Sequence, residues 1–179
     1  MDELCLDFIN SKWYATHKLN KEILRENGLL MNFFSKRNLH IDGSPDSEIQ
    51  DALLELRSFL EKTLEEFVTN RSVSRDALSK INKYLRAVPC VRVVEQVDEK
   101  YRVALKPVSL GWDWIMAEIA ASFVQLLWEC DVERIKICEN PECRWVFYDE
   151  TKSRTKRWCD DTCASRMKVR RFREKRKNI

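Results

Sequence analysis

The sequence predicts a mostly α-helical protein with a small β-hairpin, an α+β class in which a helical N-terminal domain precedes a small cysteine-containing module and a basic helix. Long segments place apolar residues three and four positions apart, which is the spacing of one helix face. Only three glycines and four prolines occur among the 179 residues, so few positions interrupt these segments. With 44% hydrophobic residues, we expect one core and an appended module, as domains at 1–132 and 133–179.

The first half of the N-terminal domain is predicted to be helical. Residues 19–38 carry apolar residues at helical spacing, and Gly28 predicts two short helices that meet there or one helix weakened in its middle. The next helix is expected to begin with Ser44 as its N-cap and Pro45 in the first helical position. Its apolar stripe continues to about Asn70.

Three further elements complete this domain. Ser74 is expected to cap a helix with four inward residues, Ala77, Leu78, Ile81 and Leu85. Residues 91–97 and 101–105 are rich in β-branched residues and flank a short polar interruption, which predicts a hairpin. Residues 112–130 predict a helix that is buried around most of its circumference, Trp128 included. Its exposed stripe is expected to hold Glu118, Ser122, Gln125 and Glu129.

Composition and charge limit the classes of function. The chain starts without a cationic segment, and no apolar run free of charges reaches membrane-spanning length, so we expect a cytoplasmic protein with reduced thiols and no membrane partner. Residues 151–179 hold twelve Lys or Arg and three Asp or Glu, a net charge of +9. Residues 1–150 hold twenty Lys or Arg and twenty-six Asp or Glu, a net charge of −6. An acidic body with a basic tail predicts a polyanionic partner.

Four of the seven cysteines form two short pairs separated by fifteen residues: Cys138, Cys143, Cys159 and Cys163. Tetrahedral zinc is bound by such a pattern, because each pair contacts the metal from one tight turn and the loop lets the pairs converge. Asn140-Pro141 is a turn signal inside the first pair, and the second pair is expected at the start of a helix. We predict one structural zinc per chain, since four thiolates leave no open coordination position. An iron–sulfur cluster or four unrelated buried cysteines are the alternatives.

Other residues near the module also carry predictions. Three arginines are expected to donate hydrogen bonds to the sulfurs: Arg144, Arg157 and Arg166. The aromatic segment 145–148 predicts a short strand or hairpin over the metal. The remaining cysteines stand among apolar neighbours and are interpreted as small core residues: Cys5, Cys90 and Cys130.

The basic tail predicts nucleic acid as a partner, DNA before RNA. Its cations repeat four positions apart, so an isolated helix would repel itself and fray, and phosphates would remove that repulsion. The loop before Cys159 adds further cations. We expect contacts from Lys152, Arg154, Lys156, Arg157, Arg166, Lys168, Arg170, Arg171 and Arg173. An RNA-binding or ribosome-associated protein, or a protein-interaction module with a solubilising tail, is the alternative.

We expect no enzymatic activity. The two histidines, His17 and His40, have no convincing Ser, Cys or Asp partner in the sequence, and no Gly-rich phosphate loop is present. Asp7 and Asn10 interrupt an apolar run and are candidates for a small-molecule effector site. A helix cap or a buried hydrogen bond explains them equally well.

The sequence resembles the CGNR zinc-finger proteins and their N-terminal ABATE domain. The matching segments are Leu4-Cys-Leu-Asp7-Phe-Ile-Asn10, Cys138-Glu-Asn-Pro-Glu-Cys143-Arg-Trp-Val-Phe-Tyr-Asp149, Arg157-Trp-Cys159 and Cys163-Ala-Ser-Arg166-Met-Lys-Val-Arg-Arg. The resemblance implies a bacterial transcription regulator with a treble-clef-like module, in which the four cysteines bind zinc and the finger binds DNA. The N-terminal domain is expected to sense a ligand or to form a homodimer. Ala164 and Ser165 stand where the family motif has Gly and Asn, and Arg166 is retained.

Overall fold

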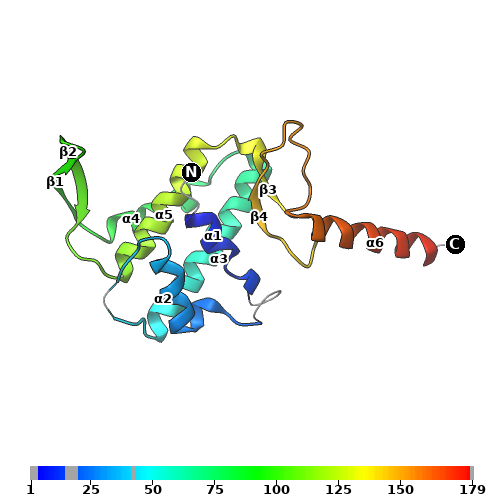
Figure 1. The fold of residues 1–179 in the computed structure, drawn as a ribbon, viewed down its shortest axis with the longest axis horizontal. Coiled ribbons are helices and arrows are strands. Elements are labelled where there is room, and N and C mark those ends of the chain that lie inside the picture. The colour runs from blue at the N-terminus through cyan, green and yellow to red at the C-terminus, as the bar shows by residue number, and fades with distance from the viewer. Residues whose placement is uncertain (1–3, 15–19, 42, 178–179) are drawn as a thin grey trace.

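The computed structural model describes residues 4–14, 20–41 and 43–177 of the chain. In these residues, helices form a central body, and a two-stranded hairpin and the C-terminal helix project from it in opposite directions (Figure 1). The predicted α+β class is confirmed. His17 lies outside the described residues, and His40 is exposed. No helix in the described part of the chain has the length and apolar character needed to span a bilayer.

The core lies where α1 (Leu4–Asn10), α3 (Ser47–Asn70) and α5 (Trp112–Glu129) meet. Each helix turns an apolar stripe toward the other two, and α4 (Arg75–Arg86) packs against α5 from the outer side. Large, fully buried side chains fill the centre: Phe8, Ile9, Leu53, Leu56, Leu60, Leu64, Ile115, Ile119 and Phe123. Burial of these side chains from water is the main force that holds the body together.

The region predicted as one weakened helix or two short ones contains two, a 3₁₀ turn η2 (Ile23–Arg25) and the helix α2 (Asn27–Ser35). They meet at Glu26 and not at Gly28, because the Glu26 backbone N–H donates to the carbonyl of Ile23 at 3.3 Å and ends the 3₁₀ turn, which the Glu22 carboxylate caps at its start. Gly28 lies in the first turn of α2.

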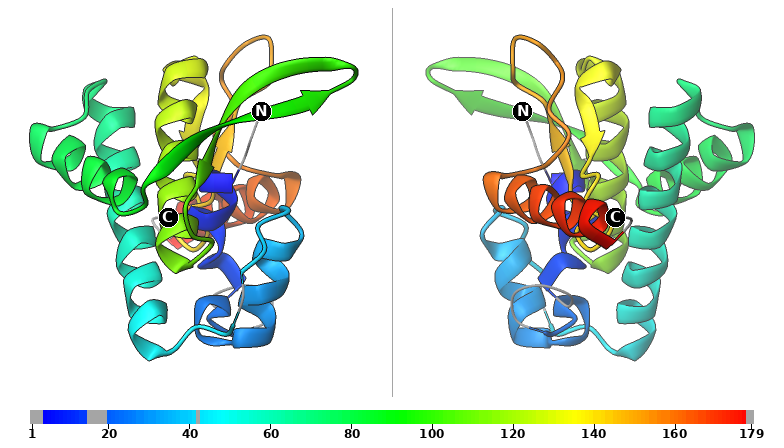
Figure 2. Two further views of the ribbon diagram at one scale, coloured as in Figure 1. Left: turned by 90° about the vertical axis from the view of Figure 1, so that its left-hand side faces the viewer. Right: turned by 90° about the vertical axis from the view of Figure 1, so that its right-hand side faces the viewer.

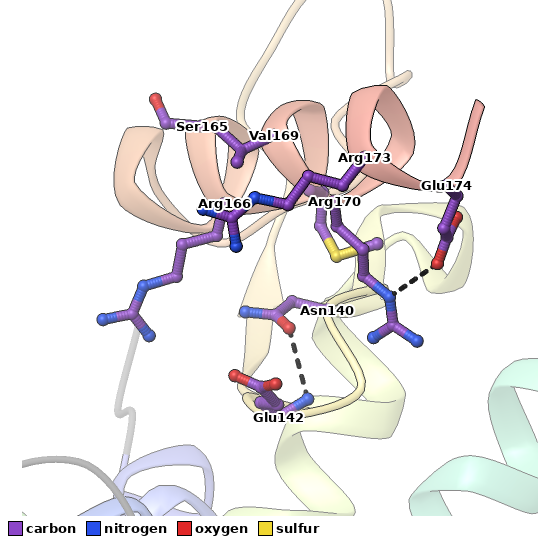
Figure 3. Close-up of a pocket in the computed structure, with 9 residues that line it drawn as sticks. Asn140, Glu142, Ser165, Arg166, Val169, Arg170, Arg173 and Glu174 are labelled. Atoms are coloured by element: carbon purple, nitrogen blue, oxygen red, sulfur yellow. Dashed lines mark hydrogen bonds and ion pairs between the residues drawn. The ribbon is translucent and has the colours of Figure 1, made fainter. Parts of the chain in front are cut away.

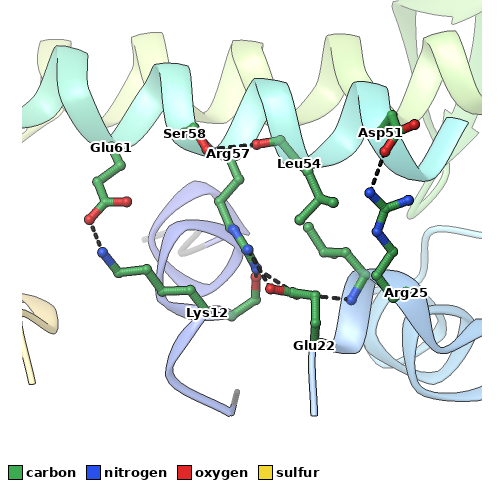
Figure 4. Close-up of polar contacts among 10 residues, drawn as sticks. Lys12, Glu22, Arg25, Asp51, Leu54, Arg57, Ser58 and Glu61 are labelled. Atoms are coloured by element: carbon green, nitrogen blue, oxygen red, sulfur yellow. Dashed lines mark hydrogen bonds and ion pairs between the residues drawn. The ribbon is translucent and has the colours of Figure 1, made fainter. Parts of the chain in front are cut away.

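A partly buried ion pair attaches this region to α3 (Figure 4). The Arg57 guanidinium donates to both carboxylate oxygens of Glu22, at 2.8 and 2.6 Å, and to the Ser11 hydroxyl at 3.0 Å. Burial alone would raise the pKa of Glu22, but the hydrogen bonds and charge of Arg57 outweigh burial and lower it. The charge of the buried Arg57 is therefore fully paired.

The start of α3 corrects one prediction. The N-cap is Asp46, whose carboxylate accepts a hydrogen bond from the backbone N–H of Ile49 at 2.9 Å, and not Ser44. An aspartate in this position also interacts favourably with the positive end of the helix dipole. The predicted end at Asn70 is confirmed, and Arg71 follows it in the left-handed conformation.

Three residues of α4 and α5 predicted to be buried are exposed: Leu78, Val124 and Trp128. Ser74 caps α4 as predicted, but Leu78 points to solvent, because α4 presents only one side, with Ala77 and Ile81, to the body. On α5, Trp128 is 87% exposed. Ser122, predicted on the exposed stripe, is buried instead.

The position of α1 explains the burial of Ser122. Helix α1 lies against that side of α5, and the Ser122 hydroxyl accepts a hydrogen bond from the backbone N–H of Cys5 at 3.1 Å. The polar stripe of α5 therefore supplies a partner to α1 and is not wholly exposed to water. Cys5 and Cys130 are buried as predicted.

The predicted hairpin is confirmed as β1 (Cys90–Val97) and β2 (Lys100–Pro107), an antiparallel pair. Asp98 and Glu99 both have positive φ angles, 47° and 62°, as a two-residue type I′ turn requires. Cys90 is exposed, contrary to the prediction of a core residue, because it opens a hairpin that stands clear of the helices (Figure 2).

The C-terminal module follows a short 3₁₀ turn, η3 (Val132–Arg134). Its strands β3 (Ile135–Ile137) and β4 (Val146–Tyr148) form an antiparallel pair, which confirms the strand predicted over 145–148. The last element is α6 (Asp161–Lys177), which continues as a helix through the basic tail.

Candidate metal centre

Four sulfur atoms converge between β3, β4 and the start of α6. The Sγ atoms of Cys138, Cys143, Cys159 and Cys163 all lie within 4.8 Å of one another. Cys143 and Cys163 are each 3.7 Å from Cys159, sulfur to sulfur. Zinc binds thiolates at about 2.3 Å, so a tetrahedral site has sulfur–sulfur edges of about 3.8 Å. The donor set and its spacing fit one structural zinc, with every coordination position taken by protein.

A tight turn presents the first pair of cysteines. The backbone N–H of Cys138 donates to the carbonyl of Trp145 at 2.8 Å, which extends the β3–β4 pairing into the site. Asn140 is buried, and its side-chain oxygen accepts a hydrogen bond from the backbone N–H of Glu142 (Figure 3). The backbone carbonyl of Asn140 accepts a hydrogen bond from the backbone N–H of Cys143 at 2.9 Å. The predicted turn at Asn140 is thus the scaffold of the first pair.

The second pair stands at the N-terminus of α6, as predicted. Asp160 caps this helix, because its carboxylate accepts a hydrogen bond from the backbone N–H of Cys163 at 2.7 Å. Cys163 therefore lies in the first turn, where the helix dipole is positive and stabilises a thiolate.

Burial controls the chemistry of these thiols. It raises the pKa of Cys143 to about 11 and also raises the pKa of Cys159. Without a metal, Cys143 and Cys159 hold their protons at neutral pH, so zinc must displace these protons when it binds. Aromatic side chains form the apolar surroundings: Trp13, Trp145, Phe147 and Trp158.

The contacts to the sulfurs differ from those predicted. Asn140 donates from its side-chain nitrogen to the Cys163 sulfur at 3.3 Å. Arg144 instead forms an ion pair with Glu65 of α3 at 2.6 Å, and Arg157 pairs with Glu139. A carboxylate forms a stronger hydrogen bond with a guanidinium than a sulfur atom does. Arg144 therefore joins the module to α3, and Arg157 joins the loop before Cys159 to Glu139.

Asp149 is a structural residue that sequence reasoning missed. It is buried, and its carboxylate accepts hydrogen bonds from the backbone and hydroxyl of Thr151 and from the backbone N–H of Lys156. Burial alone would raise the pKa of Asp149, but these hydrogen bonds keep it below its ordinary value. Asp149 thereby holds together the two ends of the segment 151–156, which is part of the cation-rich loop before Cys159. An Asp two residues before a Thr is a turn signal that could have identified it.

The module is joined to the body through Asn10. The side-chain amide of this buried residue accepts a hydrogen bond from the backbone N–H of Val146 and donates one to the Val146 carbonyl, each at 2.8 Å. Val146 and Ile135 belong to the main hydrophobic core. Of the two explanations proposed for Asn10 besides an effector site, the structure shows the buried hydrogen bond.

Asp7 lies at the edge of an open cavity of about 440 Å³ between α1, α2 and the module. It forms an ion pair with Arg37, whose guanidinium also stacks on the Phe33 ring at 4.0 Å. Trp145 of the module and Tyr14 also line this cavity. The cavity therefore brings the two effector-site candidates, Asp7 and Asn10, to the junction with the module.

The nine predicted nucleic-acid contacts are all exposed, and they fall into two groups. Three form ion pairs within the chain: Arg154 with Asp131 and Glu133, Arg157 with Glu139, and Arg170 with Glu174. The others form no ion pair with any residue that the structure describes: Lys152, Lys156, Arg166, Lys168, Arg171 and Arg173.

Two family models match the chain. The ABATE model, described as a "Putative stress-induced transcription regulator", matches residues 2–129, more than half of the sequence. The chain belongs to the ABATE family. A model described as the CGNR zinc finger matches residues 134–176, which contain all four cysteines. No curated protein matches the chain. The family resemblance and the single structural zinc are thereby confirmed.

Removing one ligand of the CGNR zinc finger should abolish tight zinc binding. Cys163→Ser replaces a thiolate that zinc binds strongly with a hydroxyl that it binds weakly. We expect the wild-type chain to release about one zinc on thiol modification, measured with a zinc-sensitive dye, and the variant to release far less. Cys90→Ser, an exposed cysteine outside the cluster, is the matched control and should keep its zinc. Equal zinc content in both variants would contradict the assignment.

Asn10→Ala should destabilise the junction between the ABATE domain and the finger. The change leaves the N–H and the carbonyl of Val146 buried without partners, at a cost of about 1–3 kcal/mol each. Urea unfolding should show a lower midpoint than wild type. The control is Asn32→Ala, an exposed asparagine that lines the same cavity. A variant as stable as this control would exclude the structural role of Asn10.

Proposed function

We propose that this zinc-containing ABATE protein is a transcription regulator whose finger binds duplex DNA through α6. One observation carries the proposal: α6 is a cationic helix that projects from the body, and most of its cations have no anionic partner in the described chain (Figure 1). Phosphates would supply the missing charge and release condensed counterions. The description of the family model as a transcription regulator supports the same reading.

The cations of α6 form two faces. At 100° per residue, Arg166, Arg170 and Arg173 share one side of the helix, and Lys168 and Arg171 lie on the opposite side. A helix in the major groove has a phosphate backbone on each side of it. Cations on two opposite sides therefore suit a helix that lies along the groove.

The surface between these faces carries two exposed apolar side chains, next to Ser165 and Arg176. Val169 and Phe172 lie on the side of α6 that points away from Cys163, and both side chains are about half exposed. Apolar side chains in a major groove can contact the methyl group of thymine. They are unfavourable on a helix that serves only to keep a protein in solution.

The shape of α6 favours DNA over RNA. An α-helix with its side chains is about 10–12 Å across, and the major groove of B-DNA is about 12 Å wide. The major groove of A-form RNA is deep and narrow, so side chains do not read it. The width of a cationic α-helix is therefore matched to the major groove of duplex DNA.

The paired arginines are proposed to have a different role. Arg154 holds its loop to Asp131 and Glu133, and Arg157 holds the loop to Glu139. Breaking these pairs would offset part of the gain from a phosphate contact. DNA binding should therefore depend more on the unpaired cations of α6 than on these two.

The ABATE domain is proposed to adjust the finger in response to a small-molecule effector. The cavity at the junction is lined by Asp7, Arg37 and Phe33 from the domain and by Trp145 from the finger. The Trp145 ring packs edge-on against Trp13 at 5.3 Å. A ligand in this cavity would contact both parts of the protein at once.

The DNA-binding proposal predicts an unequal contribution of arginines. Arg166→Ala and Arg173→Ala should each weaken duplex binding and lower the salt dependence by about one phosphate contact. Arg154→Ala is the matched control, because its ion pairs compete with phosphate, and should have a smaller effect. The measurement is titration of fluorescent duplex DNA and single-stranded RNA at several salt concentrations. Binding of neither polymer, or a preference for RNA, would overturn the proposal.

A further inference from the structure

The two faces of the β1–β2 hairpin differ. One, called here the polar face, combines an ion-pair cluster with Val91, Val93, Val97 and Ala104, and the other carries no ion pair and is mainly apolar. The register places Glu95 opposite Arg102, and Lys106 on the same side, where both cations form ion pairs with the Glu95 carboxylate at 2.9 and 2.5 Å. Alternation along the strands puts the next residues on the other side. These residues define the apolar hairpin face: Val94, Tyr101, Val103 and Leu105.

The apolar hairpin face has nothing to cover it within the described chain. Its four side chains are each 66–73% exposed, although Val94 and Val103 stand directly opposite one another. Figures 1 and 2 show the hairpin extending away from the helices. A two-stranded hairpin is marginally stable by itself in water and normally needs a further layer. Four large apolar side chains therefore face solvent, with no described residue of the chain packed on them.

We propose that this face pairs with the same face of a second copy of the chain, around a two-fold axis near the Val94–Val103 pair. The area supports this occupant. Side chains of this size, exposed to this extent, present roughly 500 Å² together, near the upper limit for an apolar patch on a monomer. Two such faces would bury roughly 1,000 Å², the lower limit for a specific interface.

The charges at the two ends of the hairpin fit the same arrangement. Arg92 is the one charged residue on the apolar side, and it lies near the base of the hairpin. The acidic residues Asp98 and Glu99 form the turn at the tip. Around a two-fold axis perpendicular to the strands, the base of one hairpin meets the tip of the other, and each Arg92 lies over the Gln96–Tyr101 pair of the partner, one residue pair away from the acidic turn. The pairing also leaves α6 free, because α6 projects from the other end of the body (Figure 1).

Sedimentation equilibrium of the full chain, from about 5 to about 200 µM, tests the proposal. The wild-type chain should approach twice the monomer mass over this range. Val103→Glu places a charge in the middle of the apolar hairpin face and should raise the dimer dissociation constant at least tenfold. The matched control is Val91→Glu, an exposed residue on the polar face and opposite Lys106, which should stay within about twofold of wild type. Zinc content of each variant confirms that it is folded.

Two further variants keep the test decisive. If Val103→Glu fails to fold, Tyr101→Lys changes the same face at its most exposed side chain. Arg92→Glu should weaken the dimer, and Arg92→Glu combined with Glu99→Arg should restore it, because the charges are exchanged. A wild-type chain that is monomeric throughout, equal effects of Val91→Glu and Val103→Glu, or no restoration by the charge exchange would each overturn the proposal. None of these results depends on DNA binding.

Discussion

The coordination of four thiolates around one zinc ion is the constraint on which the C-terminal part of this protein depends. The module has two three-residue strands and a single helix, so it lacks the apolar surface for an independent core. The metal joins a turn organised by Asn140 to the capped first turn of α6. The raised pKa values of Cys143 and Cys159 mean that, without zinc, these two sulfurs would be protonated and this link would be lost. The direction in which α6 projects is thus set by metal coordination.

The module is also fixed to the body, which distinguishes it from a finger on a flexible linker. Val146 packs in the main core, Asn10 binds its backbone on both sides, and Arg144 forms an ion pair with Glu65 of α3. Because the same strand leads into the cysteine site, a shift of the N-terminal helices would move α6 with it. The ABATE domain is thereby connected through β4 to the helix proposed to bind DNA. The cavity lined by Trp145 lies next to this connection.

Features that repeat locally could be predicted from the sequence. The spacing of apolar residues predicts α3 through Asn70 and also α5, and the paired cysteines predict the metal site. Features decided by competition between neighbours or by distant residues could not be predicted. Asp46 displaced Ser44 as N-cap, and Trp128 is exposed although it belongs to an apolar stretch. The bond from Asn10 to Val146 spans 136 positions, and no pattern in either segment indicates the other.

Zinc K-edge X-ray absorption of the purified full chain is the most direct measurement of the central claim, because it reports the atoms around the metal. The account predicts one zinc with four sulfur neighbours at about 2.3 Å and no oxygen or nitrogen in the first coordination sphere. A coordination sphere with fewer sulfurs, an iron edge in place of zinc, or a folded protein without bound metal would contradict it.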